Sequence, residues 1–248
     1  LRQHTGNWPG KTVTSAQGRC ERGGRGYVLV DLPGTYSLMA HSAEEEVARD
    51  FLCFGGADGA VVVCDATCLE RNLNLVLQTL ELQPRTVVCV NLLDEAERKG
   101  VRVELEALSR RLGVPVVGAA AGRGEGLEAL MAAVEGVISA PEPPTPVPVR
   151  YPPPVEFAVA SLRPLLEPRL RGRLPARWTA LRLLEGDGAF LDRLSAALEW
   201  DPRADAALWG AVEEARADLE RQGLGGGAWC ERVVSALVET AEAIGAAS

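Results

Sequence analysis

The 248-residue chain is long enough for one large domain or two small ones, and 47% apolar with 24% charged residues is a globular composition rather than a disordered one. A net charge of −8 argues against a nucleic-acid partner, since proteins that bind nucleic acid through its phosphates carry a basic face. No apolar run approaches the ~20 residues that a membrane span requires.

The first part of the chain alternates short apolar runs with helical patterns. Val-rich runs predict strands at 27–30, 60–64, 86–90 and 114–117. Helical patterns occupy 43–54, 69–82, 103–112 and 127–137, the first of them after Ser42, a good N-cap residue. This alternation predicts an α/β fold, with a parallel sheet whose strands are buried on both faces by helices.

A proline-rich stretch at 141–154 changes the character of the sequence. Such a stretch is typical of a semi-rigid extended linker, and it predicts a domain boundary. Beyond it, helical patterns cover 155–166, 177–185, 189–198, 204–222 and 229–244. The second domain is therefore predicted to be a small, all-α bundle.

Two polar motifs each follow a predicted strand. They are Asp31-Leu-Pro-Gly34 and Asn91-Leu-Leu-Asp94, and ligand sites of α/β sheets form at that edge. The carboxylate of Asp94 suits guanine, because it accepts hydrogen bonds from the ring N–H and the exocyclic amine together. Asp31 suits a water-mediated contact to Mg²⁺, and the N–H of Gly34 suits a γ-phosphate oxygen.

Five segments resemble the family of ferrous iron transport protein B. They are residues 6–13, 30–38, 64–73, 91–96 and, after the linker, 177–187. The resemblance implies a Ras-like G domain (a P-loop NTPase of the TRAFAC class) missing its first strand, followed by a small all-α helical domain that acts as a nucleotide-release inhibitor (GDI-like). The expected division is a truncated GTP-binding domain at 1–140, the linker at 141–154 and the helical domain at 155–248.

The same resemblance assigns roles to single residues. Thr12 would be the switch I threonine that closes on Mg²⁺ and the γ-phosphate, and it would act in hydrolysis together with Gly34. Asp31 would bind the nucleotide and hold Mg²⁺, and Asn91 with Asp94 would recognise guanine.

Residues 119–126 fall where the last base-binding loop of the family lies. There Ala120 and Ala121 would contact the nucleotide, with the Ala121 backbone N–H donating to the guanine carbonyl. The family usually has Ser at position 121, but a backbone donor survives the change to Ala. Hydrolysis is expected to be slow, because Thr35 stands where small GTPases often have a water-orienting Gln.

The resemblance also implies what surrounds the domain. The expected cofactors are GTP or GDP with Mg²⁺, and K⁺ is left open as a second cation. The expected partner is a C-terminal transmembrane Fe²⁺ transport domain of the same polypeptide. Such a protein would lie at the cytoplasmic face of the bacterial inner membrane, with this segment itself soluble.

The phosphate-binding pattern G-x-x-x-x-G-K-[ST] does not occur in the sequence. We therefore expect the sequence to be an incomplete record of a longer GTPase, and this chain alone to bind GTP poorly. The alternative left open is a catalytically inactive regulatory or interaction module that binds no nucleotide.

Overall fold

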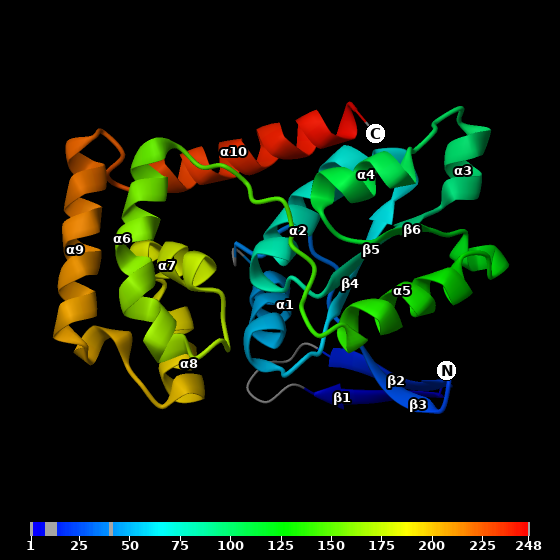
Figure 1. Cartoon of the computed structure of the whole chain (residues 1–248), viewed down its shortest axis with the longest axis horizontal. Helices are drawn as coiled ribbons and strands as arrows, with labels where there is room; N and C mark the ends of the chain where they lie inside the picture. Colours follow the sequence, from blue (N-terminus) through cyan, green and yellow to red (C-terminus); the bar gives the residue numbers. More distant parts are fainter. Residues whose placement is uncertain (1, 8–13, 40–41, 248) are drawn as a thin grey trace. The chain divides into compact units, whose positions relative to one another are not determined.

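The computed structural model describes residues 2–7, 14–39 and 42–247 (Figure 1). Its contacts divide the chain into two compact units, Leu1–Asp58 and Gly59–Ser248. Each unit contains its own three-stranded sheet. Thr12 lies outside the described residues, so its predicted role stays a prediction.

The sheet of the first unit is an antiparallel meander. Its strands are β1 (Arg2–Asn7), β2 (Thr14–Arg22) and β3 (Arg25–Asp31), in that order. A two-residue turn, Gly23-Gly24, joins β2 to β3, and both glycines have positive φ, as the favoured turns of β-hairpins require. The hairpin therefore follows from local turn chemistry.

The prediction for residues 27–30 was right about a strand and wrong about its surroundings. We expected a parallel strand buried on both faces, but β3 is an edge strand that pairs antiparallel with β2. Only Tyr27 is buried in it, and Val28 is 58% exposed. The apolar run at 27–30 did not reveal this antiparallel pairing, because the polar sequences of β1 and β2 show no strand pattern from which their presence could be predicted.

The helix of the first unit is α1 (Ala43–Phe54), with the bounds that the sequence predicted. Ser42 is its N-cap, and its hydroxyl accepts a hydrogen bond from the Glu45 N–H at 3.2 Å. Three glutamates lie in the first turn, where their negative charges interact favourably with the positive end of the helix dipole. A capped start and an apolar face thus specify this element locally.

The sheet of the second unit is parallel, in the order β4-β5-β6. Its strands are β4 (Ala60–Asp65), β5 (Thr86–Asn91) and β6 (Val116–Gly118). The central strand β5 is buried along residues 86–90, whereas Val61 and Val63 of β4 are 39% and 59% exposed. The predicted burial on both faces therefore holds for β5 and fails for β4.

Helices of this unit pack against both faces of the parallel sheet (Figure 1). They are α2 (Leu69–Leu82), α3 (Leu93–Arg98), α4 (Leu105–Leu112) and α5 (Leu127–Ser139), with single 3₁₀ turns η1 (Ala66–Cys68) and η2 (Ala121–Arg123). The apolar face predicted for α2 is buried at all five of its positions: Leu69, Leu73, Val76, Leu77 and Leu80. The short helix α3 was not predicted.

The chain between α5 and α6 has no regular secondary structure over residues 141–152, but it is not free of the fold, since Val149 and Tyr151 are buried. The helices that follow are α6 (Pro153–Leu170), α7 (Ala176–Glu185), α8 (Gly188–Leu198), α9 (Ala206–Arg221) and α10 (Ala228–Gly245), with η3 (Pro202–Ala204). α6 packs against α7 and α9, and α10 reaches back onto α2 and α4 (Figure 1).

Within the described ranges, every helix is too short or too polar to cross a bilayer.

Candidate functional site

The carboxyl ends of β4, β5 and β6 lie at one edge of the parallel sheet. Asp65 at the end of β4 is in register with Asn91 at the end of β5, and Val90 is in register with Gly118 at the end of β6. The segments that follow β5 and β6 therefore start side by side, although about 30 residues separate them in the sequence.

Asn91 joins these two segments through its side chain. Its Oδ1 accepts a hydrogen bond from the backbone N–H of Ala121 at 3.0 Å. Two backbone hydrogen bonds run alongside it, from Leu93 N–H to the Ala119 carbonyl and from Ala119 N–H to the Val90 carbonyl. The Asn91-to-Asp94 motif and the 119–126 loop thus form one hydrogen-bonded cluster.

Asp94 lies in the first turn of α3, and its side chain is 19% exposed. Its Oδ2 lies 3.1 Å from Nε of Arg123, which belongs to η2 in the neighbouring loop. Arg98, one turn further along α3, reaches the same oxygen at 3.8 Å and donates to the Asp94 backbone carbonyl. The carboxylate is therefore held by positive charge from two elements.

Leu92 gives the motif its sharp turn, with φ of +62°. A left-handed conformation is unfavourable for a residue with a branched side chain, and strain of this kind is typical of functional loops. The turn at Leu92 connects the end of β5 at Asn91 directly to the start of α3 at Leu93. Asn91 and Asp94 therefore lie in the same cluster.

The 119–126 loop folds back on itself. Ala120 forms a bridge with Glu125, and Gly124 and Gly126 both have positive φ. Ala120 is buried, whereas Ala121 is exposed at the turn. The predicted donor, the Ala121 N–H, is bonded to Asn91, so a guanine carbonyl would have to share or replace that bond.

Asp65 has a structural role next to this cluster. Its Oδ1 accepts from the Thr67 N–H at 2.7 Å and so caps η1. This backbone hydrogen bond, aided by weaker contacts, holds the pKa of the Asp65 carboxyl below its ordinary value. The residue therefore stays ionised as a cap at neutral pH.

Asp31 and Gly34 belong to the first unit. Asp31 is the last residue of β3, opposite Ala16 of β2, and its side chain is exposed. Gly34 is exposed too, and a Cβ added there would meet no described atom within 4 Å. The turn that follows is closed by Thr35, whose hydroxyl donates to the Ser37 carbonyl at 2.7 Å.

The parts of the chain that the structure describes hold no group of three or more His, Cys, Asp or Glu side chains suited to a metal ion. A cavity of about 340 Å³ is lined by residues of α6, α7 and their connection, and it contains none of the predicted base-binding residues.

Of the predicted base-binding residues, Asn91, Asp94, Ala120 and Ala121 lie in one cluster. Sequence reasoning missed Arg123. Its only signal was a positive charge inside a glycine-rich loop next to a carboxylate motif, and that pattern does not say which acid the arginine meets.

The cluster has the donor and acceptor types that a guanine edge needs. The Asp94 carboxylate offers acceptor oxygens, and the Ala121 N–H, which is bonded to Asn91 in this structure, is a donor in the adjoining loop. The residues present therefore fit a guanine base.

Comparison with known proteins identifies the family of this chain. The family model described as ferrous iron transport protein B matches residues 1–134, and the model described as the FeoB cytosolic helical domain matches residues 151–244. The Fe(2+) transporter FeoB of Escherichia coli K12 is 39% identical over 190 residues, which are 75% of this chain and 24% of that protein. The corresponding transporter of Salmonella typhimurium is 46% identical over 138 residues, 54% of this chain and 18% of that protein.

Solved structures agree as well. A GDP-bound mutant of the S. thermophilus FeoB G-domain matches with a TM-score of 0.81 and 28% identity, covering 99% of this chain and 89% of that one. The apo cytosolic domain of the T. maritima FeoB transporter matches with a TM-score of 0.76 and 28% identity, covering 98% and 87%. The chain spans about a quarter of the length of the curated relatives it matches. With a G-domain fold followed by a helical region, this chain belongs to the ferrous iron transport protein B family.

Proposed function

We propose that this chain is the guanine-nucleotide-binding region of a ferrous iron transporter. The observation that carries the proposal is the cluster at the carboxyl ends of β5 and β6, where Asn91, Asp94 and Ala121 lie together. Relatives of the same fold are described as bound to GDP or GMPPNP, which supports the same ligand class here.

Each residue of the cluster has a part in the proposal. Asp94 accepts hydrogen bonds from the ring N–H and the exocyclic amine of guanine, a pair that adenine does not offer. Asn91 braces the loop through its bond to Ala121. Ala120 and Ala121 supply the backbone that faces the base, and the Ala121 N–H shares its hydrogen bond between Asn91 and the guanine carbonyl.

By the family resemblance, Thr12, Asp31 and Gly34 are proposed to contact the phosphate end of the nucleotide. Asp31 would hold Mg²⁺ through water, Thr12 would close on the metal, and the Gly34 N–H would meet the γ-phosphate. A carboxylate and a hydroxyl are oxygen donors of the kind that Mg²⁺ prefers, with phosphate and water completing its shell. K⁺ is proposed only as an auxiliary cation, and hydrolysis is proposed to be slow.

In the whole protein, GTP binding and hydrolysis would gate Fe²⁺ uptake through a transmembrane domain of the same polypeptide. The region would then lie at the cytoplasmic face of the membrane. Since the sequence contains no G-x-x-x-x-G-K-[ST] pattern, this chain by itself is proposed to bind GTP weakly.

The missing phosphate-binding pattern also favours a second candidate. A regulatory or interaction module that binds no nucleotide would keep the same fold and the same internal hydrogen bonds. The two candidates differ in one measurable property, which is recognition of the guanine base.

The test is a titration of the ¹⁵N-labelled chain with GDP and, separately, with ADP, followed by NMR. We expect GDP to shift the amide signals of residues 91–94 and 119–124 with a dissociation constant near the millimolar range, equivalent to about 4 kcal/mol of binding free energy. ADP should leave these signals in place. Asp94→Ala should abolish the preference, whereas Glu97→Ala, which removes an exposed carboxylate from the same helix, should keep it.

Equal shifts with GDP and ADP would show that the cluster does not distinguish guanine from adenine. Shifts with neither nucleotide would favour the non-binding module.

A further inference from the structure

We propose that Arg123 is a positioning residue that fixes the carboxylate of Asp94 for guanine and thereby sets discrimination between bases. The inference rests on the proposed function and deepens it, because it assigns specificity to a side chain outside the Asn91-to-Asp94 motif.

The first support is geometric. Nε of Arg123 lies 3.1 Å from Oδ2 of Asp94 in an ion pair, whereas Arg98 lies 3.8 Å from the same oxygen. Arg98 is also tied to the backbone of its own helix, through the Asp94 carbonyl. Arg123 is therefore the stronger partner of this carboxylate, and it comes from a different loop.

The second support is that the contact is one of two side-chain ties between the same pair of segments. The Asn91–Ala121 hydrogen bond joins the end of β5 to η2, and the Asp94–Arg123 ion pair joins the first turn of α3 to η2. Two side-chain ties at different positions restrict rotation of the loop about either one. Loss of Arg123 leaves the loop held by Asn91 and the backbone contacts alone.

The chemistry of guanine explains why a fixed carboxylate matters. The base presents two N–H donors in one plane, so both carboxylate oxygens must lie in that plane to accept them. Arg123 pairs with the Asp94 carboxylate on the side of Oδ2, and both carboxylate oxygens keep acceptor capacity for the base. Holding the side chain in one orientation before binding removes part of the ordering cost.

An exposed ion pair by itself has little energetic value, and the Arg123 side chain is 57% exposed. The role inferred here is therefore orientation of Asp94, not stabilisation of the fold. It predicts a change in base discrimination that a general weakening of the loop would not produce.

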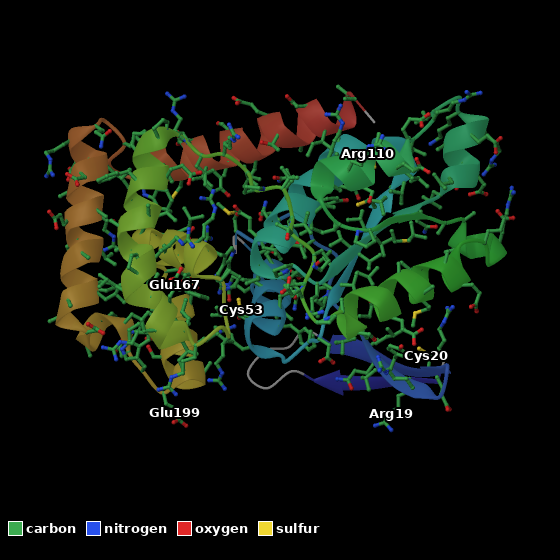
Figure 2. The ribbon with its side chains drawn as sticks, in the orientation of Figure 1. Arg19, Cys20, Cys53, Arg110, Glu167 and Glu199 are labelled. Carbon is green, nitrogen blue, oxygen red and sulfur yellow. The ribbon has the colours of Figure 1, made fainter. Side chains whose placement is uncertain are left out.

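The experiment compares GDP with inosine diphosphate, which lacks the exocyclic amine and so offers Asp94 one donor instead of two. Both nucleotides are titrated by NMR into the wild-type chain and into Arg123→Ala, Arg123→Lys and Arg110→Ala. Arg110 lies on α4, 72% exposed and labelled in Figure 2, and it is the matched control. We expect Arg123→Ala to lower the affinity for GDP several-fold and that for inosine diphosphate much less.

Arg123→Lys keeps the charge but offers a point donor in place of the planar guanidinium, so it should restore part of the discrimination. Arg110→Ala should match the wild type. An equal loss for both nucleotides would assign Arg123 a merely structural role, and tighter GDP binding in Arg123→Ala would mean that arginine and base compete. Either result overturns the proposal.

A second measurement needs no nucleotide. Amide hydrogen exchange of Ala121 should be faster in Arg123→Ala than in Arg110→Ala, because one tie of the loop is lost. Unchanged exchange contradicts the positioning role. If the wild-type chain binds neither nucleotide, the proposed function fails on its own, and the exchange result still decides whether Arg123 holds this loop.

Discussion

Gly126, in the 119–126 loop, approaches the end of β6 closely. Its φ is +83°, and a Cβ placed there would lie 2.3 Å from the Gly118 carbonyl oxygen. A left-handed conformation costs a side chain roughly 1–2 kcal/mol, and forced overpacking costs a further ~1–3 kcal/mol. We expect Gly126→Ala to lower the free energy of unfolding by about 2–5 kcal/mol in urea denaturation.

Gly124 provides the control two residues earlier. Its φ is +76°, but a Cβ there would meet no described atom within 4 Å. Gly124→Ala should therefore cost only the conformational part, about 1–2 kcal/mol. Similar losses for the two variants would mean that the close approach at Gly126 carries no energetic weight.

Single residues of the site differ in how well the sequence predicts their contacts. Parallel strands end at a common edge, so the place of Asn91 and Asp94 at that edge followed from the strand pattern, and the family resemblance supplied the 119–126 loop. The Arg123–Asp94 pair did not, because an arginine in a loop has several acids within reach and its choice depends on the final turn geometry. The hydrogen bond from the Ala121 N–H to Asn91 could not be predicted for the same reason.

At the scale of elements, local signals predicted most of the secondary structure. The bounds of α1 and α2 were predicted without error, because each has a clear apolar face, and Ser42 marks the start of α1. The sequence predicted an end of α6 near residue 166, but the helix continues to Leu170 through Pro164 and Pro168. Proline disfavours the interior of a helix, and packing of α6 against α7 and α9 outweighs that preference.

The end of α5 depends on a side chain from the strand region. Arg85, just before β5, donates hydrogen bonds to the backbone carbonyls of Val137, Ala140 and Pro141. These carbonyls lie at or just beyond the C-terminus of α5, where a positive charge is favoured. Arg85→Ala should lower the free energy of unfolding by about 1–2 kcal/mol, because charge-assisted hydrogen bonds are lost.

Hydrogen exchange localises this effect. Amides of residues 135–140 should exchange faster in Arg85→Ala, while those of α2 keep their wild-type rates. The control is Arg102→Ala, which removes an exposed arginine from the connection between α3 and α4. Unchanged protection at the end of α5 would contradict the capping role.

At the scale of the second unit, a buried polar cluster joins the sheet-covering helix α2 to the helices after residue 152. Glu81 of α2 accepts a hydrogen bond from the Tyr151 hydroxyl at 2.7 Å and lies 3.6 Å from Nε of Arg177 in α7. The Arg177 guanidinium also pairs with Glu156 of α6 and lies over the Tyr151 ring. The cluster thus links α2 of the G-domain fold to α6 and α7 of the helical region through charged and polar contacts.

The two carboxylates of this cluster respond to pH in opposite ways. Burial raises the pKa of Glu81, and contacts with Tyr151, Arg177 and Arg182 offset only part of that. Burial acts in the same direction on Glu156, but hydrogen bonds from Arg177 and the Tyr151 amide outweigh it and leave its pKa below the ordinary value. Glu81 therefore stabilises the fold at low pH and loses that contribution as pH rises through its folded pKa, whereas the contribution of Glu156 is lost as pH falls.

The matched variants Glu81→Gln and Glu156→Gln separate these two effects. Glutamine at position 81 still accepts from the Tyr151 hydroxyl and removes the cost of ionising a buried carboxyl. Relative to the wild type, Glu81→Gln should therefore become more stable as pH rises from about 4.5, the region of an ordinary glutamate pKa, towards 8. Glu156→Gln leaves Arg177 with less negative charge, so it should fall further below the wild type as pH rises from about 3.5 to 5.5. Urea denaturation across this range measures both differences, and a common direction for the two variants would disprove the opposite roles of these carboxylates.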